Sequence, residues 1–110
     1  MQLYTVIILP DAEHAIRLRA AYIVKRSGFV NTARKWVTKT KKFCYSLSRF
    51  PYRGRDRSDI YPNLRTIPHD GDIVAYTIDE TTKTVYVVAL TGPGQNFESL
   101  LKGTLSDAYH

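Results

Sequence analysis

The chain has 110 residues, 44% hydrophobic and 24% charged, which is the composition of one small globular domain and excludes a disordered segment. Its 16 lysines and arginines exceed its 10 acidic residues, giving a formal net charge of +6 that favours an acidic or polyanionic partner. No apolar run approaches the about 20 residues of a membrane span, so we expect a soluble, cytoplasmic protein with a single domain over residues 1–110.

The positive charge is concentrated in the middle of the chain. Residues 25–57 contain 11 of the lysines and arginines and one acidic residue, whereas residues 58–110 contain three and seven. Such a one-sided stretch is typical of a surface that attracts nucleic acid or an acidic protein. The alternative interpretation is a solvated helix face without a partner.

The first elements are a strand and a helix. Residues 3–9 are almost all β-branched, aromatic or apolar and end at Pro10, which predicts a strand. Because the strand is apolar on both faces, we expect a central position in its sheet. Pro10 and Asp11 then suit the first turn of a helix, and Ser27 and Gly28 form a plausible end for it.

A second amphipathic helix follows. Asn31 or Thr32 can cap it, and we expect it to run to about Phe50. Cys44 lies on its apolar stripe, which predicts a buried and unreactive thiol. The opposite face carries Arg34, Lys35, Lys39, Lys41, Lys42 and Arg49. Two amphipathic helices joined by a short loop should pack as a hairpin.

The second half of the chain predicts a loop and three strands. Residues 51–62 read as the loop, and residues 64–68, 73–78 and 84–90 as the strands, with a hairpin turn at Asp70-Gly71. Residues 97–101 offer at most one helical turn. The order therefore predicts an α+β, two-layer domain: a strand, a helix hairpin, and a three-stranded antiparallel meander.

Motifs for metal or cofactor chemistry are missing from the sequence. His14, His69 and His110 are far apart and have no cysteine pair beside them, so no zinc-type ligand spacing exists. The Gly92-Pro93-Gly94 turn lacks the further glycine and lysine of a phosphate-binding loop. The sequence predicts no catalytic, cofactor-binding or metal-ligating residue, and no cofactor.

The order of these elements and the motifs within them resemble the RelE/ParE family of toxins. The matching positions are Pro10, Ala12, Tyr22, Ile23, Pro51, Gly54, Arg55, Leu64, Arg65 and Tyr76, with residues 85–90 as the last strand. The resemblance covers nearly the whole chain and implies a two-layer RelE/ParE-like fold. It also implies a cognate antitoxin, ParD-like with an acidic C-terminal segment, in a hetero-oligomeric toxin–antitoxin complex.

The resemblance leaves two activities open. RelE-type members cut messenger RNA on the ribosome without a metal, and ParE-type members block DNA gyrase. The ribonucleases carry a cation where the third strand begins, but here Asp72 stands there, and Gln95-Asn96 replace an expected acid or base near the C-terminus. We therefore expect a gyrase inhibitor that is not an enzyme, with a metal-independent ribonuclease as the alternative. A third possibility is an inactive homologue that only binds its antitoxin.

Six cations are the candidates for contact with the partner or target: Arg53, Arg55, Arg57, Arg65, Lys39 and Lys42. Within the predicted loop of residues 51–62, which we call the basic loop, we expect Arg55 to hold the loop in place by binding backbone carbonyls or Asp59. Arg53 and Arg57 have no evident local role and are therefore the stronger candidates for the target. Gly54 is expected to adopt a positive φ, which other residues reach only at a cost.

Overall fold

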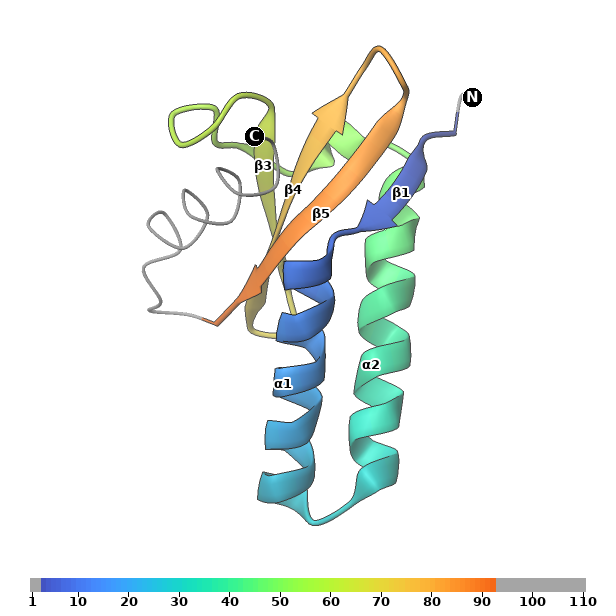
Figure 1. Ribbon diagram of the computed structural model, residues 1–110, viewed down its shortest axis with the longest axis vertical. Helices are drawn as coiled ribbons and strands as arrows, with labels where there is room; N and C mark the ends of the chain where they lie inside the picture. The colour runs from blue at the N-terminus through green and yellow to red at the C-terminus, as the bar shows by residue number, and fades with distance from the viewer. Residues whose placement is uncertain (1–2, 93–110) are drawn as a thin grey trace.

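The computed structural model describes residues 3–92, which form a two-layer α+β fold (Figure 1). The elements in chain order are β1 (Thr5–Ile8), α1 (Pro10–Ser27), α2 (Val30–Tyr45), β2 (Arg55–Asp56), β3 (Leu64–His69), β4 (Asp72–Asp79) and β5 (Thr84–Thr91). The two helices lie side by side as an antiparallel hairpin, as the sequence predicts. No helix in this part of the chain has the length and apolarity needed to cross a membrane.

The sheet has the strand order β1-β5-β4-β3-β2. Strands β3, β4 and β5 form the expected antiparallel meander, and β1 pairs in parallel with β5. The prediction of a central first strand is wrong, because β1 lies at the edge. Its residues alternate: Val6 and Ile8 pack against the core, whereas Thr5 and Ile7 are exposed. Although β1 has apolar residues on both of its faces, only one face is packed against the core.

Both ends of α1 agree with the sequence, but those of α2 differ. Gly28 ends α1 with φ 77, and its N–H donates to the Val24 carbonyl at 2.7 Å. Helix α2 begins at Val30, so neither Asn31 nor Thr32 is its cap. It also stops at Tyr45, well before Phe50.

The early end of α2 has a local cause. The Ser46 hydroxyl donates to the Phe43 carbonyl at 2.5 Å, and side chains that bond to the backbone in this way compete with helix propagation. A 3-10 turn over Ser46–Ser48 follows. Phe50 then adopts the left-handed conformation, with φ 51, directly before Pro51, which itself disfavours a helical conformation at the preceding residue.

The predicted loop 51–62 is more regular than expected. It contains a 3-10 turn over Pro51–Arg53 and the short strand β2, which pairs antiparallel with β3 through Arg55 and Thr66. At the next turn along the chain, Asp70 and Gly71 both have positive φ, which confirms the hairpin predicted there.

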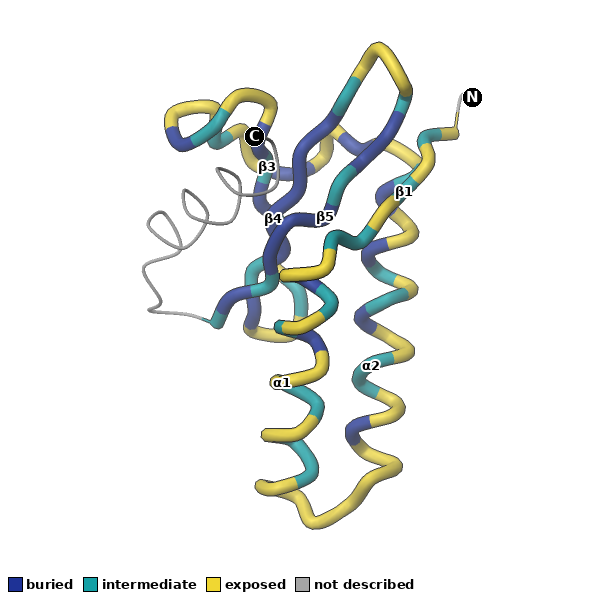
Figure 2. The backbone as a smooth tube through the Cα atoms, viewed as in Figure 1, coloured by how far each residue is buried: buried dark blue, intermediate teal, exposed yellow. Residues whose placement is uncertain are grey.

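Apolar side chains are buried on both faces of the sheet. The cluster on the helix side comprises Ala12, Cys44, Leu47, Val74, Tyr76, Ile78, Val85 and Val87. A second cluster comprises Ile60, Leu64, Ala75, Val88 and Ala89. The predicted burial of Cys44 is confirmed, and this burial raises the pKa of its thiol to about 11. Figure 2 shows that burial is concentrated near the sheet, whereas the far end of the helix hairpin is mostly exposed.

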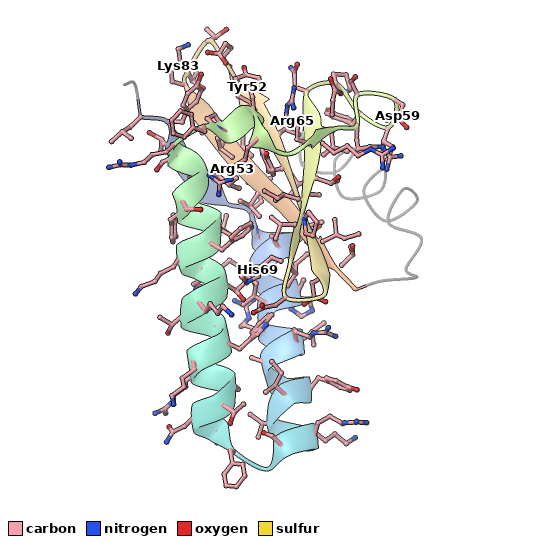
Figure 3. The ribbon with its side chains drawn as sticks, turned by 180° about the vertical axis from the view of Figure 1, so that it is seen from behind. Tyr52, Arg53, Asp59, Arg65, His69 and Lys83 are labelled. Atoms are coloured by element: carbon pink, nitrogen blue, oxygen red, sulfur yellow. The ribbon has the colours of Figure 1, made fainter. Side chains whose placement is uncertain are left out.

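The β3–β4 hairpin packs onto α2 through His69. Its ring stacks on Phe43 with centroids 4.4 Å apart, and its Nε2 lies 3.3 Å from the Thr40 hydroxyl oxygen. Figure 3 shows His69 beside α2. His110, Gln95-Asn96 and the helical turn expected at residues 97–101 lie outside the described residues.

Candidate partner-binding surface

The basic loop is anchored by one buried tyrosine of β4. The Tyr76 hydroxyl donates to the Pro51 carbonyl at 2.7 Å and accepts from the Gly54 N–H at 3.0 Å. Gly54 has φ −76, so the prediction of a positive φ is wrong. Glycine is required for a steric reason, because a Cβ atom would lie 2.4 Å from the Tyr76 hydroxyl oxygen and 3.0 Å from the Thr66 carbonyl oxygen.

Arg53 ties the loop to the end of α2. Its guanidinium donates to the Arg49 carbonyl at 3.0 Å, the Ser46 carbonyl at 3.3 Å and the Ser46 hydroxyl at 2.7 Å. It also lies 5.7 Å from the centroid of the Phe43 ring. The expectation that Arg53 has no local role is therefore wrong.

Arg57 and Arg65 also hold the loop. Figure 3 labels Tyr52, Asp59 and Arg65 in this region. Arg57 donates to both carboxylate oxygens of Asp59 at 3.0 Å, so it too has a local role that the sequence did not reveal. The Arg65 guanidinium donates to the carbonyls of Gly54 at 2.7 Å and Tyr52 at 2.9 Å. It lies 5.0 Å from the centroid of the Tyr52 ring.

Arg55 is the arginine of this loop that faces solvent without a fixed partner. Within residues 3–92 its side chain makes no hydrogen bond or ion pair, so the prediction that it holds the loop is wrong. The Arg57 bond lowers the pKa of Asp59, and the charge of Arg55 adds to this effect from a distance. Arg55 was expected to hold the loop, and Arg53 and Arg57 were expected to have no local role; in the structure, Arg53 and Arg57 hold the loop and Arg55 is exposed.

The two predicted lysines of α2 remain available on the surface. Lys39 pairs with Asp70 at 3.2 Å, but its side chain is 66% exposed. Lys42 is exposed and forms no ion pair with any other described residue. Arg55, Lys39 and Lys42 are therefore exposed to solvent, whereas Arg53, Arg57 and Arg65 bind groups of their own chain.

A carboxylate in the β4–β5 turn collects hydrogen bonds that the sequence did not predict. Glu80 accepts from the hydroxyls of Tyr4 and Tyr52 and from the ammonium of Lys83. These donors, of which Lys83 has the largest effect, lower the pKa of Glu80 to about 2. The hydrogen bond between Tyr52 and Glu80 raises the pKa of Tyr52 to about 12. The network joins the residue before β1, the basic loop and the β4–β5 turn. Only the spacing of Glu80 and Lys83 was visible in the sequence.

Asp72 lies at the start of β4 and is buried beside α1. One carboxylate oxygen, Oδ1, accepts a hydrogen bond from Arg19 at 2.7 Å, whereas Oδ2 has no hydrogen-bond partner among the described residues. Burial raises the pKa of Asp72, although the positive charge of Arg19 opposes this effect. Asp72 borders a pocket of about 290 Å³ between α1 and the end of β5.

Solved structures with a similar fold are toxin–antitoxin systems. The chromosomal ParDE system from P. aeruginosa superimposes with a TM-score of 0.69 at 14% sequence identity, over 82% of this chain and 96% of that chain. The RelBE2 toxin–antitoxin complex from Mycobacterium tuberculosis gives a TM-score of 0.61 at 17% identity, over 82% of this chain and 98% of that one. At these identities the likeness establishes the RelE/ParE fold.

The sequence comparison is more specific about the family. No curated protein sequence matches this chain significantly. The sequence profile described as the ParE toxin of type II toxin-antitoxin system, parDE, matches residues 6–97, which include every helix and strand of the described fold except the first residue of β1. The chain therefore belongs to the ParE toxin family of type II toxin–antitoxin systems.

Proposed function

We propose that this toxin inhibits DNA gyrase by binding to it and that a ParD-like antitoxin with an acidic segment keeps it inactive. The family assignment supports the toxin role, and both structural neighbours are toxin–antitoxin systems, which supports a hetero-oligomeric complex. The surface charge of Arg55, Lys39 and Lys42 suits an acidic antitoxin segment and speeds its encounter with the toxin.

The observation that most favours a binder over a ribonuclease is the use of the charged groups. A ribonuclease without a metal needs cations positioned to stabilise the charge that develops on the phosphate. At the start of β4, where the ribonucleases carry a cation, this chain has the buried carboxylate of Asp72. The guanidinium groups of Arg53 and Arg65 bind carbonyl oxygens of their own chain. These groups therefore serve the fold and are not free for phosphate.

The proposed activity is tested with purified toxin in two assays run side by side. We expect inhibition of gyrase supercoiling and accumulation of cleaved plasmid, while ribosome-bound messenger RNA stays intact. Cleavage of the message with gyrase unaffected would establish the ribonuclease instead. Binding to the antitoxin with neither activity would identify the chain as an inactive homologue.

A pair of charge reversals tests the contact surface. We expect Lys42→Glu with Arg55→Glu to weaken gyrase inhibition about tenfold, because both side chains are exposed and steer encounter through their charge. The matched control is Arg17→Glu with Lys25→Glu, which makes the same change of charge on exposed positions of α1. Equal losses in both pairs would show a dependence on net charge alone and would exclude this surface as the contact.

A further inference from the structure

We propose that the outer face of α2 binds the phosphate backbone of the duplex DNA that gyrase holds. The inference rests on the gyrase inhibition proposed above and names the part of the gyrase–DNA complex that this helix recognises. Figure 2 shows the exposed positions of α2 mainly on the side that faces away from α1. We call the exposed side chains of residues 31–45 the outer face: Asn31, Thr32, Arg34, Lys35, Thr38, Lys39, Lys42 and Tyr45.

Every side chain of the outer face donates hydrogen bonds. Four are cations, the others carry a hydroxyl or an amide, and none is acidic or aliphatic. Phosphate oxygens accept hydrogen bonds, and these residue types are the ones through which proteins contact the DNA backbone. The buried centre of a protein interface is instead depleted in charged residues, lysine among them. The outer face therefore suits a phosphate backbone better than a protein surface.

The chain itself does not neutralise the cations of this face. Within residues 3–92, Arg34, Lys35 and Lys42 form no ion pair. Lys39 pairs with Asp70 at 3.2 Å, but its side chain stays 66% exposed. The four cations extend over about 12 Å of helix, and duplex DNA carries one phosphate per about 1.7 Å of its axis. Several phosphates therefore lie within reach of the face.

The two helices differ in what their charges do for the fold. In α1, acidic residues lie in the first turn and Lys25 and Arg26 in the last, as the helix dipole favours. Helix α2 has no acidic residue in its first turn. On its outer face, Lys35 and Lys39 are like charges one turn apart, which slightly destabilise a helix. The cations of α2 therefore bring the fold no evident benefit, which favours a role in binding.

The same face explains how an antitoxin keeps the toxin inactive. Lys39 and Lys42 belong to the surface proposed above for the acidic antitoxin segment. A carboxylate-rich segment and a phosphate backbone compete for the same cations, so the antitoxin and the DNA should exclude each other at this face.

The test measures the affinity of the full-length toxin for immobilised gyrase, alone and carrying a duplex, by surface plasmon resonance at 50 and 200 mM salt. With four phosphate contacts, the duplex should add a factor of about 100 to the loss of affinity over this range, since each contact contributes about 0.9 to the slope of log affinity against log salt. Arg34→Gln with Lys35→Gln removes two contacts and should reduce this factor to about ten.

The matched control is Arg17→Gln with Lys25→Gln, which removes one arginine and one lysine from exposed positions of α1. It should keep the factor of about 100. Thermal unfolding of the free toxin separates binding from folding. The melting temperature of the Arg34→Gln, Lys35→Gln variant should stay constant or rise, because the repulsion between residues 35 and 39 is relieved.

A crosslinker on the outer face identifies the bound molecule directly. Thr38→Cys places an exposed thiol among the cations, whereas the natural Cys44 is buried, so a photoactivatable label attaches at residue 38. Irradiation of the inhibited gyrase–DNA complex should join the toxin to a DNA strand. A crosslink to a gyrase subunit in place of DNA would overturn the inference.

The remaining outcomes are distinct. An unchanged salt dependence in the α2 variant, or an equal reduction in both variants, would overturn the DNA contact while leaving gyrase inhibition in place. A wild-type toxin that does not affect gyrase would refute the function proposed above, and the DNA contact would fail with it.

Discussion

The basic loop and the Asp72 pocket differ in whether their polar groups have hydrogen-bond partners. At the loop, Arg53 and Arg57 of the loop and Arg65 of β3 donate to acceptors within the chain. At the pocket, Asp72 keeps one buried carboxylate oxygen that has no partner among the described residues. The loop has the denser charge in the sequence, yet most of that charge stabilises the fold. The density of charge in the sequence is therefore a poor guide to how much of that charge remains free for a partner.

Gly54→Ala in the basic loop is the substitution for which we expect the largest loss of stability. The new Cβ atom would collide with the Tyr76 hydroxyl, and we expect the free energy of unfolding to fall by about 3 kcal/mol. Gly71→Ala is the control, since nothing lies within 4 Å of its Cβ position and only its positive φ is strained. Its cost should be about 1 kcal/mol in urea denaturation. Equal costs would mean that the loop is not tightly packed.

Tyr76→Phe removes the hydroxyl that anchors the loop. The Pro51 carbonyl and the Gly54 N–H would lose their partner in a buried place, so we expect a loss of about 2 kcal/mol in the same denaturation experiment. Combined with Gly54→Ala, the loss should be smaller than the sum, because the colliding oxygen is gone. Strict additivity would contradict the packing described here.

Arg53→Ala and Arg55→Ala distinguish a structural arginine from a free one. Arg53 binds the end of α2, so its removal should lower the free energy of unfolding by about 1 kcal/mol. Arg55 is exposed and unpaired, so its removal should change stability by less than about 0.5 kcal/mol. Thermal unfolding of the two variants measures the difference, and a reversed order would restore the sequence-based prediction.

The smallest expected effect concerns Glu80 and pH. Its pKa falls from 4.5 to about 2 in the folded state, so the ionised carboxylate stabilises the fold above pH 4.5, and this contribution is lost as pH falls through 2. We expect Glu80→Gln to flatten the decline of melting temperature between pH 4.5 and 2. Lys83→Met, which removes the strongest donor, should reproduce part of that change. An unaltered slope in both variants would exclude the network as a source of acid sensitivity.

Local patterns predicted most of the fold. Pro10, Gly28 and the Asp70-Gly71 pair each act through their own backbone, so the start and end of α1 and the β3–β4 turn were predictable. The edge position of β1 was not, because it depends on pairing with a strand far away in sequence. The early end of α2 depends on the hydrogen bond of the Ser46 hydroxyl, which residue helix propensities do not take into account.

The candidate surface was predicted less well, for a physical reason. Sequence shows which residues are charged, but not whether an acceptor lies within reach after folding. Arg53 and Arg55 differ by two positions and look alike in the sequence, yet only Arg53 faces carbonyl groups at the end of α2. Likewise, Asp72 stood out as an acid in place of a cation, but its pairing with Arg19 joins elements 53 positions apart.

The parallel pairing of β1 with β5 has a consequence for how this toxin is synthesised. Thr5 lies opposite Thr84, so the strand made first meets its neighbour only after the last strand of the sheet has been translated. Contacts between such distant segments form slowly compared with those of adjacent helices. A nascent chain therefore carries β1 and the apolar side of the helix hairpin without their sheet.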